Sequence, residues 1–203
     1  MAAAARIVIT GTPGVGKHTA ARLVSKTLGA ELVDINKIAL SEGLIAHGSS
    51  EGKGIEVDRP KLSRRISQLL ADNPRGKIVV GHVAPYVVKR SDADVVVVLR
   101  RSPYDLLETL QKRGYSEEKA RENVASEILG VVLFDSIKSF GRRRVTEIDT
   151  TGRTPRQTAG EIVSAAGNIS KRTGRGNAQA SVDWLSVVAE KGDVRRFFDH
   201  SPL

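Results

Sequence analysis

The sequence predicts an α/β fold in which a five-stranded parallel β-sheet carries helices on both faces. Short runs rich in β-branched residues alternate along the chain with segments of helical periodicity, and this alternation is typical of parallel sheets. The run Val95–Val98 is apolar at every position, as expected for a strand that is covered on both faces. The 203 residues suffice for one domain of this kind with its own core.

The first half of the chain is expected to supply three of the strands. β-Branched residues flanked by turn residues identify these strands at Ile7–Ile9, Glu31–Ile35 and Ile78–Val80. A glycine-rich turn precedes the first helix, Lys17–Leu28, and Gly29 follows it as expected for a helix end. Another helix begins at Asn36–Leu40, and a polar, glycine-rich loop follows at 43–54. Apolar residues then recur on one face of a helix at Lys61–Leu70.

The second half is expected to continue the same alternation. Its strands are predicted at Asp94–Leu99 and Val145–Asp149. Pro103 opens a helix, because proline is favoured in a first helical turn. Ser116, followed by two glutamates, is expected to cap one long helix that reaches towards Phe134 and Ile137. Thr154 is the expected N-cap of a helix over Pro155–Ala166.

The chain divides into three regions by composition. Residues 1–166 form the expected α/β domain, 167–180 a basic linker and 181–203 a C-terminal helical extension. The linker carries Lys171, Arg172 and Arg175, together with glycines and no acid. The extension begins with a helix at Ser181–Glu190 and holds three of the eight aromatic residues of the chain, Trp184, Phe197 and Phe198. We therefore expect it to dock, either on its own core or on a partner.

The composition limits the classes of function. The chain has no cysteine, which excludes a disulfide framework, a thiolate metal site and a thiolate nucleophile. The net charge of +9 favours polyanionic partners such as nucleotides or RNA. The aromatic content of 4% argues against binding single strands mainly by base stacking. No apolar run approaches a membrane span, and Met1–Ala5 is too short for a signal peptide. We expect a soluble cytoplasmic protein without membrane contacts.

The stretch Arg6–Thr19 carries the strongest functional signal. A strand, the sequence Gly-Thr-Pro-Gly-Val-Gly-Lys at Gly11–Lys17 and a helix start follow one another directly, which is the context of a phosphate-binding loop. Backbone N–H groups of such a loop point at one anion, and the helix dipole adds positive potential there. We expect the loop to bind ATP, with the Lys17 ammonium on the outer phosphates. The expected binding residues are Gly14, Val15, Gly16, Lys17, His18 and Thr19.

One position departs from this motif. His18 stands where the pattern expects Ser or Thr, whose hydroxyl ligates magnesium. Because Mg²⁺ prefers oxygen ligands, a neutral imidazole is a poor replacement, although the backbone N–H of His18 can still bind phosphate. We expect Mg²⁺ as a cofactor, with its ligands left unassigned among water, Thr19 and a carboxylate elsewhere. Asp34 is the nearest candidate acid in the sequence, and it is equally placed to cap the next helix.

Several segments of the chain resemble the adenylate kinase isoenzyme 6 family. These segments are Gly11–Lys17, Val98–Arg100, Leu110–Lys119 and Glu122–Ile128. The resemblance covers about Arg6–Ala166 in the right order and spacing, and the tail lies outside it. Members of this family are nucleoside monophosphate kinase-like ATPases of archaea and eukaryotes that are linked to maturation of the small ribosomal subunit. The resemblance implies a P-loop kinase fold with the first strand central, ATP and AMP as substrates, a platform protein of the small ribosomal subunit as partner, and rRNA nearby.

The resemblance also implies two segments that close over the nucleotide. Residues at about 36–59 would form the monophosphate-binding flap, and residues at about 112–122 a short lid whose Arg113 reaches the nucleotide. A guanidinium that closes over phosphates neutralises the charge that spreads during transfer. Arg100 and Arg101 follow the fourth strand, at the sheet edge where ligands bind in such folds. These two arginines are either ligand contacts or ordinary surface charges.

A third implied site residue follows the third strand. The family carries Asp-x-His at this point, with the Asp near magnesium-bound water and the His implicated in ATP hydrolysis. Here the motif has Val80 in place of the acid and keeps the histidine as His82. An imidazole titrates near neutral pH and can orient or deprotonate water. The expected catalytic residues are therefore Lys17, His82 and Arg113.

Four hypotheses for the function remain open at this point. The first is ATP-dependent phosphorylation of a nucleoside monophosphate, AMP in particular, with some ATP hydrolysis. The second is an assembly factor whose ATPase cycle times the release of a ribosomal partner. The third is a small-metabolite kinase of the same architecture, such as a shikimate or gluconate kinase. The fourth is a non-catalytic binding module, which the two departures at His18 and Val80 favour.

Overall fold

The computed structural model describes residues 5–45, 57–71, 76–169 and 182–198. Five parallel strands form one sheet in the order β2-β3-β1-β4-β5, so the first strand is central as predicted. The strands are β1 (Arg6–Gly11), β2 (Glu31–Asp34), β3 (Lys77–Val80), β4 (Val95–Arg100) and β5 (Val145–Asp149). This architecture confirms the predicted α/β fold class.

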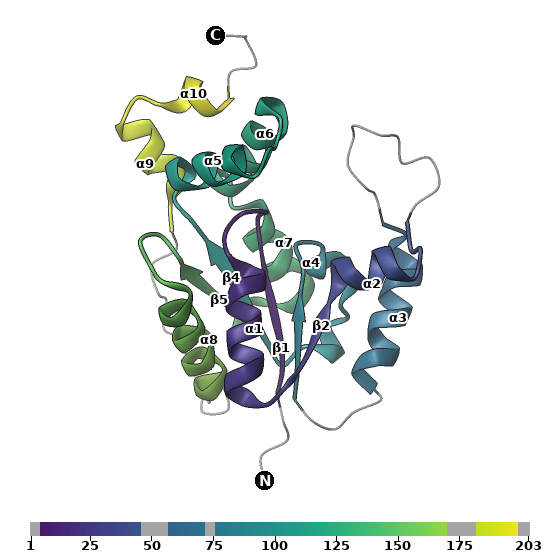
Figure 1. Ribbon diagram of the computed structural model, residues 1–203. Helices are drawn as coiled ribbons and strands as arrows, with labels where there is room; N and C mark the ends of the chain where they lie inside the picture. The colour runs from purple at the N-terminus through teal and green to yellow at the C-terminus, as the bar shows by residue number, and fades with distance from the viewer. Residues whose placement is uncertain (1–4, 46–56, 72–75, 170–181, 199–203) are drawn as a thin grey trace.

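Helices cover both faces of the sheet (Figure 1). The helix α1 (Lys17–Leu28) and the helix α8 (Pro155–Ile169) contribute to a core on one face, with Val24 and Ile162 fully buried there. The opposite core contains residues of α3 (Arg59–Ala71), α4 (Ala84–Val87) and α7 (Val131–Phe140). The short helix α2 (Ile35–Ser41) follows β2 directly. The β4 valines are shared between the two cores, Val95 and Val97 in one and Val96 and Val98 in the other, which explains why this run lacks polar alternation.

Two helices and the phosphate-binding loop meet at the carboxyl end of the sheet. The helix α5 (Pro103–Lys112) and the helix α6 (Glu117–Ile128) pack against each other above the loop that joins β1 to α1 (Figure 1). Gly11 ends β1 with a φ of 143°, and a Cβ atom there would lie 2.4 Å from the Leu99 carbonyl oxygen on β4. Only glycine fits this backbone-to-backbone approach. The loop is therefore held tightly against the sheet.

The predicted long helix from Ser116 towards Ile137 is wrong. The Ser116 side chain does cap α6, where it accepts a hydrogen bond from the backbone N–H of Lys119 at 3.3 Å. The helix ends at Ile128, however, and Gly130 adopts a left-handed conformation with a φ of 65° before α7 begins. Glycine takes this conformation at little cost, so it ends one helix and allows the chain to turn into the next.

The C-terminal regions also differ from their predicted bounds. The helix α8 continues to Ile169, so the first residues of the predicted basic linker are helical, and the remainder of that linker lies outside the described residues. The predicted helix at Ser181–Glu190 begins at Trp184, with the Asp183 side chain as its N-cap. It is α9 (Trp184–Glu190), and α10 (Val194–Phe198) follows it. Most of the predicted loop at 43–54 lies outside the described residues as well.

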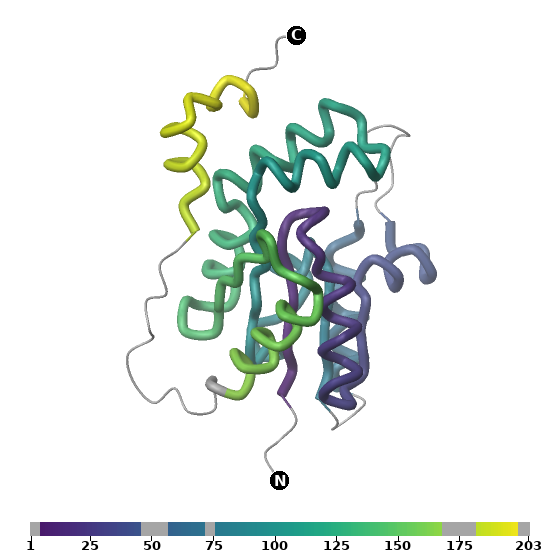
Figure 2. The backbone as a smooth tube through the Cα atoms, turned by 60° about the vertical axis from the view of Figure 1, so that its left-hand side comes forward, coloured from purple at the N-terminus to yellow at the C-terminus, as the bar shows by residue number. Residues whose placement is uncertain are grey.

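The C-terminal helices dock on the chain itself. Both α9 and α10 contact α6, and both views place them beside α5 and α6 (Figures 1 and 2). The Phe197 ring stands edge-on to Tyr104 of α5 with a centroid distance of 5.3 Å, and the Tyr104 hydroxyl donates to the Asp193 carboxylate at 2.7 Å. Trp184 and Phe197 are buried in the core of that face. Of the two predicted docking modes, the structure shows the one on the chain's own core.

Within the described ranges, none of the helices has the length and apolarity that a membrane crossing requires.

Candidate active site

A cleft of about 180 Å³ opens beside the glycine-rich loop. It brings together Lys17 from the start of α1, His82 from the end of β3 and Arg113 from the end of α5, three residues that are far apart in the sequence. The complete lining is Pro13, Gly14, Gly16, Lys17, His18, Thr19, Asn36, His82, Arg113 and Tyr115. All three predicted catalytic residues therefore face one space, together with most of the predicted binding residues.

Val15 is the predicted nucleotide-binding residue that does not line this cleft. Its side chain is buried in the core, and its backbone N–H points to the Thr12 carbonyl oxygen at 3.4 Å. The neighbouring Gly14 has a φ of 97°, and a Cβ atom there would lie 2.6 Å from the Leu106 side chain of α5. The loop thus packs against α5 on one side and leaves its other side open to the cleft.

The Lys17 ammonium is buried beneath the cleft. The residue is 5% exposed, and its Nζ donates to the carbonyl oxygen of Thr12 at 3.3 Å. Burial lowers the pKa of Lys17 to about 8, with a further decrease from the Arg113 charge, while the carboxylates of Glu127 and Asp34 oppose the shift. Lys17 is therefore still mostly charged at neutral pH, and an anion in the cleft would stabilise that charge.

His82 lies in the same cleft as an uncharged imidazole. Burial lowers its pKa to about 4, and the positive charges of Lys17, His18 and Lys119 add to the shift. The expectation that this imidazole titrates near neutral pH is therefore wrong, because burial and the nearby cations disfavour its charged form. At neutral pH the ring can accept a hydrogen bond at one nitrogen. The backbone reason for its position is that β3 ends at Val80 and the chain turns at Gly81 towards the loop.

His18 pairs with Asp34 across the gap between α1 and β2. The distance from His18 Nε2 to Asp34 Oδ2 is 3.5 Å, while Asp34 Oδ1 accepts from the backbone N–H groups of Asn36 and Lys37 at 3.1 and 3.2 Å. Asp34 is thus the N-cap of α2, as one of the two sequence interpretations proposed. Burial and the Lys17 charge lower the pKa of His18, although the Asp34 carboxylate opposes the shift.

The described residues do not fit a magnesium ion held by carboxylate side chains. The cleft lining contains no carboxylate, and both oxygens of Asp34 are engaged elsewhere. Val80, at the position of the family's acid, is fully buried. No group of three or more His, Asp or Glu side chains in the described part of the chain is arranged to hold a metal ion. A magnesium ion that accompanies the nucleotide would therefore be held by phosphate oxygens and water, and the Thr19 hydroxyl, which lines the cleft, is the predicted protein ligand that stays open.

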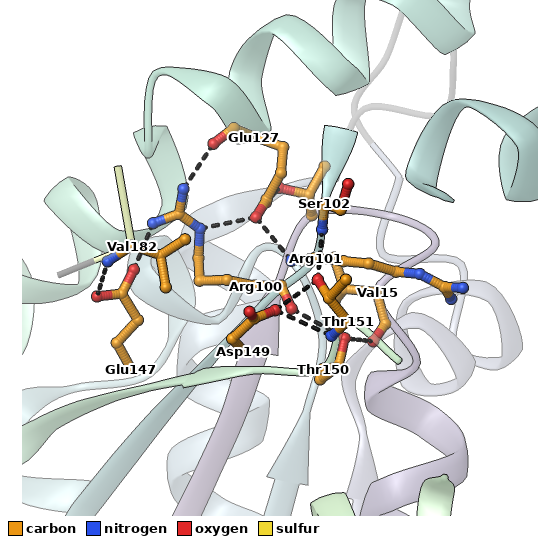
Figure 3. Close-up of polar contacts among 11 residues, drawn as sticks. Val15, Arg100, Arg101, Ser102, Glu127, Glu147, Asp149, Thr150, Thr151 and Val182 are labelled. Carbon is orange, nitrogen blue, oxygen red and sulfur yellow. Dashed lines mark hydrogen bonds and ion pairs between the residues drawn. The ribbon is translucent and has the colours of Figure 1, made fainter. Parts of the chain in front are cut away.

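Arg100 is neither a ligand contact nor a surface charge. It is 2% exposed, and its Nε donates to Glu127 Oε1 at 2.7 Å, while the same guanidinium pairs with Glu147 on β5 (Figure 3). Neither sequence interpretation of Arg100 was right, because a long-range ion pair buries the guanidinium. Arg101 also lies outside the cleft lining, and its Nε is 4.0 Å from the Asp105 carboxylate on α5.

Besides Pro13 in the glycine-rich loop, three residues of the site were not found from the sequence. Asn36 and Tyr115 line the cleft, and Glu127 contacts the loop from α6. Asn36 begins the predicted flap, and Tyr115 stands within the segment that resembles the family beside Arg113. A polar side chain at the start of the flap and another within the lid could have identified both residues as candidates for nucleotide contact. The role of Glu127 could not be predicted from the sequence, because a single glutamate on a helix with both polar and apolar residues is normally exposed to solvent.

Solved structures of two kinases share the fold of this chain. A gluconokinase from Sinorhizobium meliloti 1021 matches with a TM-score of 0.53 at 16% identity, covering 82% of this chain and 94% of that chain. A shikimate kinase from Aquifex aeolicus matches with a TM-score of 0.53 at 16% identity, covering 82% and 99%. At this identity the likeness concerns the fold, and it places the chain in the P-loop kinase architecture.

Sequence relatives then define the family. The family model described as "AAA domain" matches residues 7–130. A protein of Pyrococcus furiosus named "Putative adenylate kinase" is 36% identical over 187 residues, covering 91% of this chain and 93% of its own. A protein of the same name from Methanocaldococcus jannaschii is 34% identical over 198 residues, covering 98% of each. The chain therefore belongs to this archaeal family of adenylate kinase-like P-loop proteins, which confirms the resemblance seen in the sequence.

Proposed function

We propose that the protein transfers the γ-phosphoryl group of ATP to AMP and hydrolyses ATP as a slower side reaction. The observation that supports this most directly is the convergence of Lys17, His82 and Arg113 on the cleft beside the glycine-rich loop. A buried ammonium, loop N–H groups and a guanidinium at the cleft provide the positive charge that a triphosphate needs. Membership of a family with relatives that are named "Putative adenylate kinase" supports AMP as acceptor.

In the proposed transfer, an oxygen of the AMP phosphate attacks the γ-phosphorus of ATP in line. The bond from that phosphorus to the β–γ bridging oxygen breaks, and ADP leaves with the electron pair, so that two molecules of ADP result. Lys17 and the loop N–H groups would hold the donor phosphates, and Arg113 would neutralise the charge on the transferred group. In the hydrolytic reaction the neutral ring of His82 would accept a hydrogen bond from the attacking water and orient it, because with a pKa of about 4 the ring is a weak base at neutral pH.

The test of this function is a coupled assay of ATP consumption with and without AMP. We expect AMP to accelerate ATP consumption at least tenfold with two ADP formed per ATP, on the scale of rate gains from a positioned acceptor. His82→Ala should reduce hydrolysis without AMP by about a hundredfold, as for loss of a group that positions the attacking water, and should reduce the transfer to AMP much less. ATP consumption that is indifferent to AMP would refute the kinase function and favour the ATPase hypothesis.

A role in small-ribosomal-subunit maturation is a further part of the proposal. It is supported by the resemblance stated above and by the net charge of +9, which suits proximity to rRNA. Under this proposal, a platform protein of the small subunit is the partner whose release is coupled to ATP turnover. The aromatic residues Trp184 and Phe197 give this proposal no support, because they are buried against the chain's own helices.

The affinity for ATP is expected to fall as the pH rises above 8. Lys17 binds phosphate in its charged form, and its pKa in the free protein is about 8. Below this value the charged form predominates, and at pH 9 only about a tenth of the molecules keep the charge. Calorimetric titrations with ATP between pH 7.5 and 9.5 should therefore show a loss of affinity of about 25-fold, the ratio of the charged fractions of Lys17 at the two pH values.

The matched variant for this prediction is Lys17→Arg. A guanidinium stays protonated throughout this range, so the affinity of the variant, whatever its absolute value, should be independent of pH. An equal decline in both proteins would show that another group is responsible for the pH dependence.

A further inference from the structure

We propose that Glu127 is a positioning residue for the phosphate-binding loop. Its carboxylate accepts a hydrogen bond from the Thr12 hydroxyl and so holds Thr12 in place. The carbonyl oxygen of Thr12 in turn fixes the position of the Lys17 ammonium. The inference rests on the proposed function, since it names what places the cation of that same site. Neither Glu127 nor Thr12 lines the cleft, so both act through Lys17.

The Glu127 carboxylate is buried, and both of its oxygens accept hydrogen bonds. It is 2% exposed, and its Oε1 atom accepts hydrogen bonds from Arg100 Nε at 2.7 Å and from the Arg101 backbone N–H at 3.0 Å (Figure 3). The guanidinium of Arg100 also donates to the Glu127 carbonyl oxygen at 2.7 Å and pairs with Glu147 on β5. The end of α6 is thus joined to the carboxyl end of β4, and through Arg100 to the middle of β5, by charged hydrogen bonds, which are stronger than neutral ones.

The other carboxylate oxygen reaches the glycine-rich loop. Glu127 Oε2 accepts a hydrogen bond from the Thr12 hydroxyl at 2.5 Å, and Thr12 is 1% exposed. The carbonyl oxygen of Thr12 accepts from Lys17 Nζ at 3.3 Å and from the Val15 N–H at 3.4 Å. A rotation of the Thr12 backbone would move both of these contacts. Because the side chain of Thr12 is held, the position of the ammonium is defined relative to the sheet before any ligand enters.

The charge of Glu127 also stabilises the Lys17 ammonium that its hydrogen bonds help to position. Burial and the Arg113 guanidinium lower the pKa of Lys17, and the Glu127 carboxylate is the first of the two groups that oppose this shift. Arg100 pairs with both Glu127 and Glu147, so its one positive charge is shared between two carboxylates. The negative charge of Glu127 is therefore only partly balanced by Arg100. The same residue that fixes the loop therefore also helps to keep its lysine protonated.

The position of Glu127 also connects the loop to the predicted lid. The helix α6 begins just after Arg113 and Tyr115, which line the cleft, and ends one residue beyond Glu127. One end of this helix therefore follows two residues that line the cleft, and the other end carries the carboxylate that contacts the loop.

Thr12→Val and Thr12→Ser test this inference as a matched pair. Valine keeps the shape of threonine without the hydroxyl, whereas serine keeps the hydroxyl without the methyl group. We expect Thr12→Val to lower kcat/KM for ATP by about ten- to a hundredfold, because small displacements of a positioning group have effects of this size. Thr12→Ser should stay within about threefold of the wild type. The KM for AMP should be unchanged in both variants.

A second variant, Glu127→Asp, keeps the charge but withdraws the carboxylate from Thr12, and it should reproduce the loss seen in Thr12→Val. Calorimetric titration with ATP in all four proteins, alongside melting temperatures, provides a readout that does not need turnover. Equal ATP affinities of folded Thr12→Val and Thr12→Ser would overturn the inference, and so would a matching rise in the KM for AMP. A wild-type protein that binds ATP but shows no AMP-dependent turnover would refute the proposed function, while the titrations would still decide the role of Glu127.

Discussion

Lys17→Ala is expected to lower the turnover of ATP by about a hundred- to a thousandfold, the usual loss when one preorganised donor to a developing charge is removed. The Lys17 ammonium is the buried cation at the base of the cleft, and its Nζ already lies against the loop at the Thr12 carbonyl oxygen. Water that enters the space left by the side chain cannot supply a full charge to the outer phosphates. The measurement is the coupled assay at saturating ATP, together with titration calorimetry for the affinity.

The control for this variant is Lys138→Ala. Lys138 lies on α7, is exposed and does not line the cleft, so its removal changes the net charge of the protein by the same amount. Turnover by Lys138→Ala should equal that of the wild type. If Lys17→Ala retained more than about a tenth of the activity, the ammonium would not be the group that stabilises the transferred phosphoryl group.

Much of the site could be predicted because its signals are local. The glycine-rich loop is a continuous stretch, and its strand and helix flanks are readable from periodicity alone. The same is true of the departures at His18 and Val80, where the absence of an oxygen ligand is visible in the sequence. Their structural surroundings agree, since His18 pairs with Asp34 and Val80 is buried.

His82 and Arg113 needed a different argument. A lone histidine after a strand and an arginine at a helix end are weak signals, and only the resemblance to a family gave them roles. The structure brings both into the cleft with Lys17, and their catalytic roles remain proposals. The sequence could not give the uncharged state of His82, because its low pKa results from burial and from cations that belong to other elements.

The features that the sequence did not predict are products of long-range packing. Arg100 and Glu127 are 27 residues apart, and nothing at either position indicates that each would be buried against the other. The break at Gly130 was missed because helical periodicity continues on both sides of it, from α6 into α7. The docking of Phe197 on Tyr104 depends on where α10 lies in space. A pattern within one element contains no information on such contacts.

Arg113→Ala is expected to reduce kcat by about a thousandfold, the lower end of the range for an arginine that stabilises phosphoryl transfer. Arg113 is the C-cap residue of α5 and reaches the cleft from above the loop. Since its charge serves the transition state more than the bound ATP, the affinity for ATP should fall much less than kcat. Arg113→Lys should recover only part of the rate, because an ammonium cannot offer the paired donors of a guanidinium. Arg156→Ala, which removes an exposed arginine from α8, is the control and should be fully active.

The same variant has a second consequence that separates a role at the phosphates from general damage to the lid. The Arg113 charge lowers the pKa of Lys17, so its removal should raise that pKa. The loss of ATP affinity at alkaline pH should then begin at a higher pH in Arg113→Ala than in the wild type, whereas Arg113→Lys should keep the wild-type profile. A normal kcat in Arg113→Ala would show that this guanidinium does not act on the transferred group. An unchanged pH dependence of the ATP affinity in that variant would show that it lies too far from the Lys17 ammonium to shift its pKa. The lid residue that contacts the phosphates would then have to be another one, and Tyr115, which lines the same cleft, is the first candidate.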